Sequence, residues 1–303
     1  MKNFTLEEWI EWQCNLHSTN MDFNLSRIKK VANKLNIHKT KSTVFTVAGT
    51  NGKGSTVAIL ESILIENDFK VGSYTSPHLL QFNERIKINK NPASTEEICF
   101  AFETIEEARG KTTLTFFEYS TLAAFLIFSK KDLDIIILEV GLGGRLDAVN
   151  IIDPDVSIIT NIGLDHTAIL GDDPEKIAYE KSGIMRKNKD TVIGYDTPHM
   201  SIKKNSKVVG SNLHILNEQY SYKIISNKNW LFSNSDNVKI EYDNPGLNGI
   251  IQINNAAAAI QAVHCCKKIT LDKDKTNLGL RKATILGRFQ VENTSPRTIL
   301  DIA

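Results

Sequence analysis

Cysteine and long apolar runs are both scarce in this sequence. Its 303 residues include four cysteines, and no two of them form a Cys-x-x-Cys pair. This pattern predicts neither a disulfide framework nor a zinc site. No apolar stretch approaches the roughly 20 residues of a membrane span, and the N-terminus carries acids where a signal peptide has its apolar core. We therefore predict a reduced, cytoplasmic protein that does not enter a membrane.

An excess of charge is also missing. Lysine and arginine number 36 and aspartate and glutamate 35, which gives a formal net charge of +1. This balance argues against a nucleic-acid binder that relies on bulk charge. With 41% hydrophobic and 23% charged residues, the composition is typical of an ordinary globular chain. The length allows one large domain or two small ones and a sizeable core.

The most informative stretch is a strand, a glycine-rich turn and a helix in succession. Residues 44–48 are mostly β-branched or apolar, residues 49–55 contain three glycines, and residues 57–64 place apolar side chains at helical spacing. This layout is typical of a phosphate-binding loop, where backbone N–H groups and the helix dipole face the anion. Lys53 would supply a charge for phosphate, and Ser55 or Thr56 a hydroxyl near Mg²⁺.

The spacing of this stretch departs from the common G-x-x-x-x-G-K-[ST] pattern. The only glycine upstream of Gly52 is Gly49, and Gly54 intervenes before Ser55. The alternative is an ordinary tight turn. We favour the phosphate loop because the strand, three glycines, a lysine and a hydroxyl coincide.

Strands and helices alternate along most of the chain, which predicts an α/β fold with a mostly parallel sheet flanked by helices. We expect strands at 43–48, 70–74, 83–88, 134–141, 155–162, 191–194 and 297–303. We expect helices at 5–17, 25–35, 57–64, 95–108 and 115–127, one starting near residue 174, and one at 255–263. Residues 196–250 are polar and poorly periodic, and we expect a small β-rich part there.

Ligands bind at the carboxyl ends of the strands in such sheets, so the residues there are candidates for chemistry. Glu139 ends an apolar strand and is a candidate Mg²⁺ ligand; a capping or salt-bridged acid is the alternative. Ser76 and His166 also follow strands, and a neutral imidazole can ligate a metal. Lys181 lies on an expected helix, where a lysine is usually solvated. The glycines that begin at Gly141 fail as a dinucleotide fingerprint.

Ten short motifs, taken together, closely resemble those of the folylpolyglutamate synthase/dihydrofolate synthase family of the Mur ligase superfamily, in the family's order and nearly end to end. The matching segments are 49–55, 75–79, 82–86, 115–118, 139–148, 160–166, 180–184, 255–257, 287–290 and 301–303. The family joins L-glutamate to a pterin-bearing carboxylate at the expense of ATP. The resemblance therefore implies an ATP-dependent amide-forming ligase that acts, in the bacterial manner, on both dihydropteroate and reduced folates.

The resemblance also implies roles for individual residues. The ATP site would contain Thr50, Asn51, Gly52, Lys53, Gly54, Ser55, Asn255, Arg288 and Asp301. The dihydropteroate pocket would contain Met21, Asp22, Phe23, Thr115, Phe116, Phe117, Glu118, Leu146, Asp147 and Ala148. Ser76 and Glu139 would hold one Mg²⁺, and His166 would help to hold a second. Lys53, His166 and Lys181 would be catalytic, and Lys181 matches a lysine that becomes carbamylated. Partners would be small molecules only, and the family is mostly monomeric.

Two departures from the family pattern matter. Leu286 stands where the family usually has proline, and the sequence ends at Ala303, where the family continues into a C-terminal domain. We therefore expect an ATP-binding domain at 1–286, and at 287–303 a linker and the first strand of a truncated α/β domain.

One alternative is an inactive remnant that binds ATP or pterin without turnover. Others are a P-loop kinase and a Mur ligase for a nucleotide-sugar peptide; the Thr-Phe-Phe-Glu segment disfavours the latter.

Overall fold

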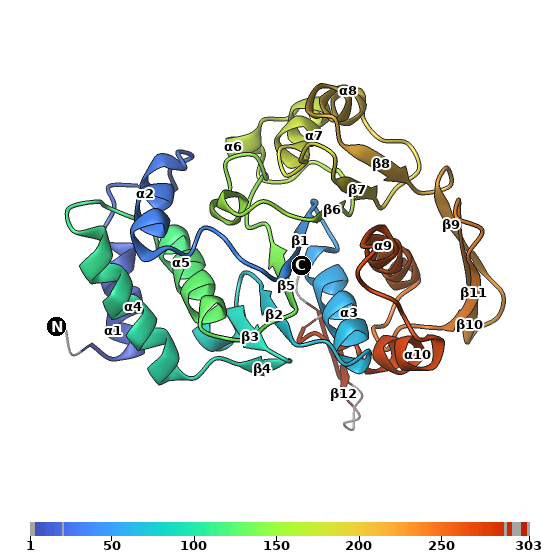
Figure 1. Cartoon of the computed structure of the whole chain (residues 1–303), viewed down its shortest axis with the longest axis horizontal. Helices are drawn as coiled ribbons and strands as arrows, with labels where there is room; N and C mark the ends of the chain where they lie inside the picture. The colour runs from blue at the N-terminus through green and yellow to red at the C-terminus, as the bar shows by residue number, and fades with distance from the viewer. Residues whose placement is uncertain (1–3, 20, 288–289, 293–297, 302–303) are drawn as a thin grey trace.

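A sheet of eight strands forms the frame of the molecule (Figure 1). The computed structural model describes residues 4–19, 21–287, 290–292 and 298–301. The strands are β1 (Thr43–Ala48), β2 (Val71–Tyr74), β3 (Ile86–Ile88), β4 (Asn91–Pro92), β5 (Ile135–Glu139), β6 (Val156–Ile159), β7 (Asp190–Ile193) and β8 (Asn212–Ile215). Their order in the sheet is β4-β3-β2-β5-β1-β6-β7-β8, and every pair from β2 to β8 in this order is parallel. The pairs β2–β3 and β3–β4 are antiparallel, so β3 runs opposite to both of its neighbours. The predicted mostly parallel α/β sheet is confirmed.

The central strand β1 is buried on both of its faces. Val44 and Ala48 belong to one hydrophobic core, whereas Phe45 and Val47 belong to a second core on the opposite face. Alternate residues of a strand point to opposite faces, so a strand covered on both faces needs an unbroken apolar run. The β-branched composition of β1 follows from this position.

Helices cover both faces of the sheet (Figure 1). One core includes side chains from α1 (Leu6–Cys14), α2 (Ser26–Leu35), α4 (Thr95–Arg109), α5 (Phe116–Ser129), α7 (Pro174–Ser182) and α8 (Met200–Val209). The other includes side chains from α3 (Lys53–Glu66), α9 (Ile251–Cys265) and α10 (Lys273–Lys282). A short helix, α6 (Thr167–Leu170), precedes α7. None of the helices described is long and apolar enough to cross a membrane.

Two sequence predictions differ from the structure. The strand expected at 83–88 is only β3, because Phe82–Arg85 forms a 3₁₀ helix that Gln81 and Glu84 cap reciprocally. The region 196–250 begins with α8, which we did not predict, and with β8, which joins the main sheet. Its antiparallel strands are confined to β9 (Tyr220–Ile224), β10 (Asn229–Asn234) and β11 (Lys239–Asp243).

The C-terminal strand also forms. β13 (Thr298–Leu300) pairs with β12 (Gln290–Glu292) in a separate two-stranded antiparallel sheet. Residues 297, 302 and 303 of the predicted strand lie outside the described residues. The division of the chain at residues 286 and 287 stays a prediction.

Candidate active site

The glycine-rich turn between β1 and α3 is held by the segment that follows β6. The N–H groups of Thr50 and Asn51 both donate to Asn161 Oδ1, at 3.2 and 2.8 Å. Helix α3 begins at Lys53, after Gly52 at a φ of +82°, and no described side chain caps it. Its first N–H groups therefore remain for an anion, as in a phosphate-binding loop, whereas the N–H groups of Thr50 and Asn51 are already used.

Close approaches explain two of the loop glycines. A Cβ at Gly49 would lie 1.8 Å from Thr160 Oγ1, and a Cβ at Gly52 would lie 2.9 Å from Asn255 Oδ1. Asn255 is buried on α9, and its Nδ2 donates to Gln252 Oε1. The predicted ATP contact Asn255 thus lies directly against the loop, some 200 residues further along the chain.

Two lysine amines converge on one carbonyl oxygen of the loop. Lys53 Nζ donates to the oxygens of Gly49 and Thr50, both at 3.0 Å, and Lys181 Nζ donates to the Gly49 oxygen at 2.9 Å. Lys181 is only 4% exposed. Burial, and secondarily the charge of Lys53, lower the pKa of Lys181 to about 8. The helical pattern of α7 gives no sign of this position, which only the tertiary structure reveals.

Oxygen donors gather beside the first turn of α3. Glu139 is buried at the end of β5, and its Oε2 accepts the N–H of Ser76 at 3.1 Å. Its Oε1 lies 3.7 Å from the point where a Cβ at Gly54 would be. A carboxylate and a hydroxyl beside a phosphate loop are the hard donors that Mg²⁺ prefers. His166 precedes α6, and its side chain is 53% exposed.

A pocket of about 520 Å³ opens at Ser76, whose N–H contacts Glu139. It is walled by the segment after α1, the start of α5, the end of β2 and the loop after β5. All ten residues predicted for the dihydropteroate pocket line it: Met21, Asp22, Phe23, Thr115, Phe116, Phe117, Glu118, Leu146, Asp147 and Ala148. Ser76 and His166 line it too. The structure therefore brings predicted substrate and metal residues together; their roles stay predictions.

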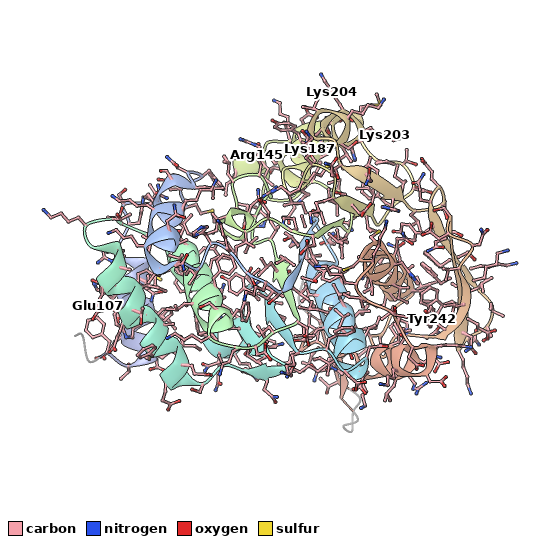
Figure 2. All side chains as sticks on the ribbon, in the orientation of Figure 1. Glu107, Arg145, Lys187, Lys203, Lys204 and Tyr242 are labelled. Carbon is pink, nitrogen blue, oxygen red and sulfur yellow. The ribbon has the colours of Figure 1, made fainter. Side chains whose placement is uncertain are left out.

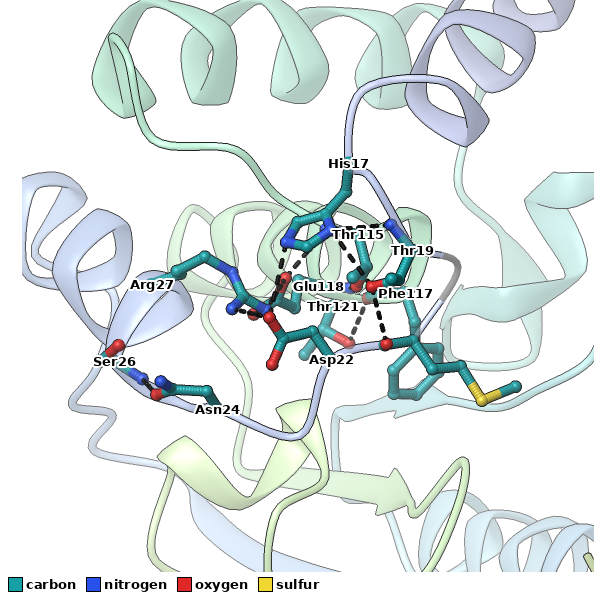
Figure 3. Close-up of polar contacts among 11 residues, drawn as sticks. His17, Thr19, Asp22, Asn24, Ser26, Arg27, Thr115, Phe117, Glu118 and Thr121 are labelled. Carbon is teal, nitrogen blue, oxygen red and sulfur yellow. Dashed lines mark hydrogen bonds and ion pairs between the residues drawn. The ribbon is translucent and has the colours of Figure 1, made fainter. Parts of the chain in front are cut away.

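A charged network that the sequence did not reveal lies on one wall of the pocket (Figure 3). Arg27 forms ion pairs with Asp22 and with Glu118, whose two carboxylate oxygens lie 3.1 and 3.2 Å from Arg27 Nη2. Glu118 also accepts the N–H of Thr115 at 2.8 Å and so caps α5. Burial raises the pKa of Glu118. His17 Nε2 lies 3.6 Å from Asp22 Oδ2.

Asp147 is a second buried acid on the pocket wall. Its carboxylate accepts the N–H of Leu142 at 2.8 Å and that of Val149 at 3.0 Å. Burial raises the pKa of Asp147 to about 6, although these backbone hydrogen bonds oppose the shift. The side chain is therefore mostly ionised at neutral pH and can accept hydrogen bonds from a ligand.

Two predicted ATP contacts stay predictions. Asp301 follows β13 with an exposed side chain, and Arg288 lies outside the described residues.

A group of side chains that could ligate a metal lies on β7, β8 and α9, where the donor atoms of Asp190, His214 and Cys265 come within 4.8 Å of one another. Asp190 bonds His214 at 2.9 Å, and Gln261 bonds both His214 and Cys265. We interpret it as a hydrogen-bonded chain, because each donor atom already has a protein partner.

Comparison with known proteins decides the family. Residues 47–263 match the Mur ligase middle domain. Over 298 residues the chain is 39% identical to the dihydrofolate synthase/folylpolyglutamate synthase of Escherichia coli K12. The aligned residues cover 98% of this chain and 69% of the E. coli protein. The chain belongs to the dihydrofolate synthase/folylpolyglutamate synthase family. The resemblance predicted from the motifs is thereby confirmed, as is the predicted class of ATP-dependent ligase.

Solved structures of the dihydrofolate synthase/folylpolyglutamate synthase family share the fold. An E. coli protein in complex with DHPP and ADP has a TM-score of 0.94 and 39% identity, over 99% of this chain and 71% of that one. A bifunctional relative with Mn, AMPPNP and L-glutamate bound has a TM-score of 0.92 and 38% identity, over the same shares. The relative from Buchnera aphidicola of Schizaphis graminum is 41% identical over all of this chain and 71% of its own length.

Proposed function

We propose that this chain ligates L-glutamate to dihydropteroate and to reduced folates through an acyl phosphate. The proposal is carried by one pocket that joins aromatic and acidic side chains, suited to a flat pterin, to Ser76 and His166. Ser76 contacts Glu139, whose carboxylate lies near Gly54 of the phosphate loop. Relatives with about 40% identity bind DHPP with ADP, or AMPPNP with Mn and L-glutamate. Ligands of the same classes fit the donor types found here.

The chemistry follows from charge. A carboxylate is a poor electrophile, so its oxygen first attacks the γ-phosphorus of ATP, the bond from that phosphorus to the β,γ-bridging oxygen breaks, and ADP leaves. Lys53 and the first turn of α3 stabilise the charge that develops on the transferred phosphoryl group. The glutamate amine then attacks the acyl carbon and loses a proton, and phosphate departs from the tetrahedral intermediate. No step needs a covalent enzyme nucleophile.

The metal and pterin subsites follow from the donor types present. Ser76 and Glu139 would hold one Mg²⁺, and His166 would contribute to a second. Bound Mg²⁺ would neutralise phosphate charge during phosphoryl transfer. Phe116 and Phe117, which also line the pocket, offer aromatic rings, and the ionised Asp147 accepts N–H groups of a pterin edge.

Lys181 is expected to react with CO₂ once it has lost its proton. The neutral amine attacks the carbon of CO₂, a proton leaves the nitrogen, and a carbamate with one negative charge forms beside Lys53. Because the pKa of Lys181 is lowered to about 8, the neutral fraction rises steeply between pH 7 and 9. A ¹³C NMR carbamate signal from ¹³C-bicarbonate should grow over this range and vanish in Lys181→Arg. A signal that persists in Lys181→Arg would place the carbamate elsewhere.

The ligase itself is tested by product analysis. Incubation with ATP, Mg²⁺, L-glutamate and dihydropteroate, or a reduced folate, should release phosphate and yield an amide larger by one glutamyl residue in mass spectrometry. Phosphate release should depend on glutamate. Stoichiometric phosphorylated product without amide would indicate a kinase. Tight binding of ATP or pterin without turnover would support the inactive-remnant alternative.

A further inference from the structure

Arg85 is a buried cation on the wall of the pocket. It ends the 3₁₀ helix Phe82–Arg85 and is 7% exposed. Its Nε–H donates to His78 Nδ1 at 2.7 Å, and its Cζ lies 5.2 Å from the ring centre of Phe116 and 5.7 Å from that of Phe82. Two aromatic rings and a histidine therefore hold the plane of the guanidinium in place.

Arg85 has no carboxylate partner among the described residues. Each of the other arginines in the described part of the chain does have one: Arg27, Arg109, Arg145, Arg186 and Arg281. Removing a charge from water without a counter-ion costs free energy. Arg85 is the most buried of these arginines, and no carboxylate of the described residues offsets this cost. Because Arg85 lines the pocket, a ligand can bring the missing negative charge.

The acids that line the pocket are engaged elsewhere. Asp22 and Glu118 pair with Arg27, and Asp147 accepts backbone N–H groups. His78 Nδ1 accepts the Arg85 Nε–H at 2.7 Å but brings no carboxylate to the guanidinium. The counter-ion of Arg85 must therefore come from outside this set of side chains.

We propose that Arg85 binds the carboxylate of the acceptor substrate through its Nη1 and Nη2 atoms and holds it near Ser76. A planar guanidinium matches a carboxylate with two parallel hydrogen bonds. The Arg85 backbone oxygen accepts the N–H of Thr75 at 2.9 Å, which ties this residue to the strand end that carries Ser76. This inference rests on the proposed function and adds to it the residue that selects an acidic acceptor over its neutral analogue.

The test compares two ligands and three proteins by equilibrium binding without ATP. The ligands are dihydropteroate and its carboxamide, which has the same rings but no charge. The proteins are the wild type, Arg85→Gln and Arg85→Lys. The wild type should prefer the acid by about 10- to 100-fold, as a charge-assisted pair predicts. Arg85→Gln should bind the carboxamide as the wild type does and lose the preference, and Arg85→Lys should keep part of it.

The outcomes separate this inference from the proposed function. If the wild type binds acid and amide equally, or if Arg85→Gln keeps the preference for the acid, Arg85 does not bind the carboxylate, although the pterin pocket stands. If the wild type binds neither compound, the proposed function itself fails. Carboxamide binding by each variant also reports that its pocket is folded, and Arg85→Lys decides the question if Arg85→Gln does not fold.

Discussion

Replacing Lys53 with methionine is expected to lower ATP-dependent turnover by about 10²- to 10³-fold, the usual effect of removing one group that stabilises transition-state charge. Methionine keeps the length of the side chain but not its charge. It also cannot donate to the carbonyl oxygens of Gly49 and Thr50, which Lys53 Nζ contacts at 3.0 Å. The loss should therefore appear both in the rate and in the affinity for nucleotide.

The measurement is turnover at saturating ATP together with calorimetric titration of ATP. Lys204→Met is the matched control, because Lys204 is exposed on α8 and Figure 2 shows it at the outer edge of the molecule. The control should keep both values. Turnover of Lys53→Met within about threefold of the wild type would remove Lys53 from the catalytic machinery.

Replacing Arg27 with methionine should cost about 3–5 kcal/mol of unfolding free energy, as breaking a buried ion pair does. The change leaves Glu118, which is 4% exposed, charged without its partner and beside Asp22. Burial already raises the pKa of Glu118, and loss of Arg27 raises it further. The unfolding free energy of the variant is retained while Glu118 is protonated and falls as the pH rises through the folded pKa of Glu118. The variant should therefore be least destabilised in acid.

Urea unfolding of Arg27→Met at pH 5 and pH 7.5 measures both effects. The double variant Arg27→Met/Glu118→Gln should recover much of the loss, because the glutamine oxygen can still accept the N–H of Thr115. Arg145→Met is the control, since Arg145 pairs with Glu180 while 41% exposed and should lose no more than about 1 kcal/mol. Equal losses in the two single variants would show that the Arg27 network is not a buried one.

Local patterns were enough to predict most of the frame. β1, β5 and β6 are apolar, largely β-branched runs because helices cover both faces of the sheet. Helices α1 and α5 begin at capping boxes, whose Thr-x-x-Glu pattern can be recognised in the sequence. The strand predicted at 83–88 is too long because the alternation of polar and apolar residues is confined to 85–88. Before it, the Glu84 carboxylate accepts three backbone N–H groups and a 3₁₀ helix forms. We did not predict α8, because its sequence is mostly polar and its few buried side chains are covered by neighbouring elements.

The site divides in the same way. The phosphate loop follows β1 and Glu139 ends β5, so their place at the carboxyl edge of the sheet could be predicted from topology alone. The environments of Arg27, Arg85 and Lys181 could not, because each depends on partners far along the chain: Arg27 on Glu118, Arg85 on Phe116, and Lys181 on Gly49. No periodicity encodes such contacts.

The dependence of the glycine-rich turn on α9 and α10 bears on how the chain folds as it is made. Asn255 of α9 lies against Gly52. Further along α3, the hydroxyl of Ser62 donates to the backbone oxygen of Gly279 on α10 at 2.6 Å. A ribosome that has released only the first 250 residues has exposed the loop and α3 without the two helices that shelter them. We therefore expect the loop to reach its final conformation only after α9 and α10 have emerged, although the loop itself emerges early. The apolar face of α3 that packs against these helices is the surface that a chaperone would meet in the interval.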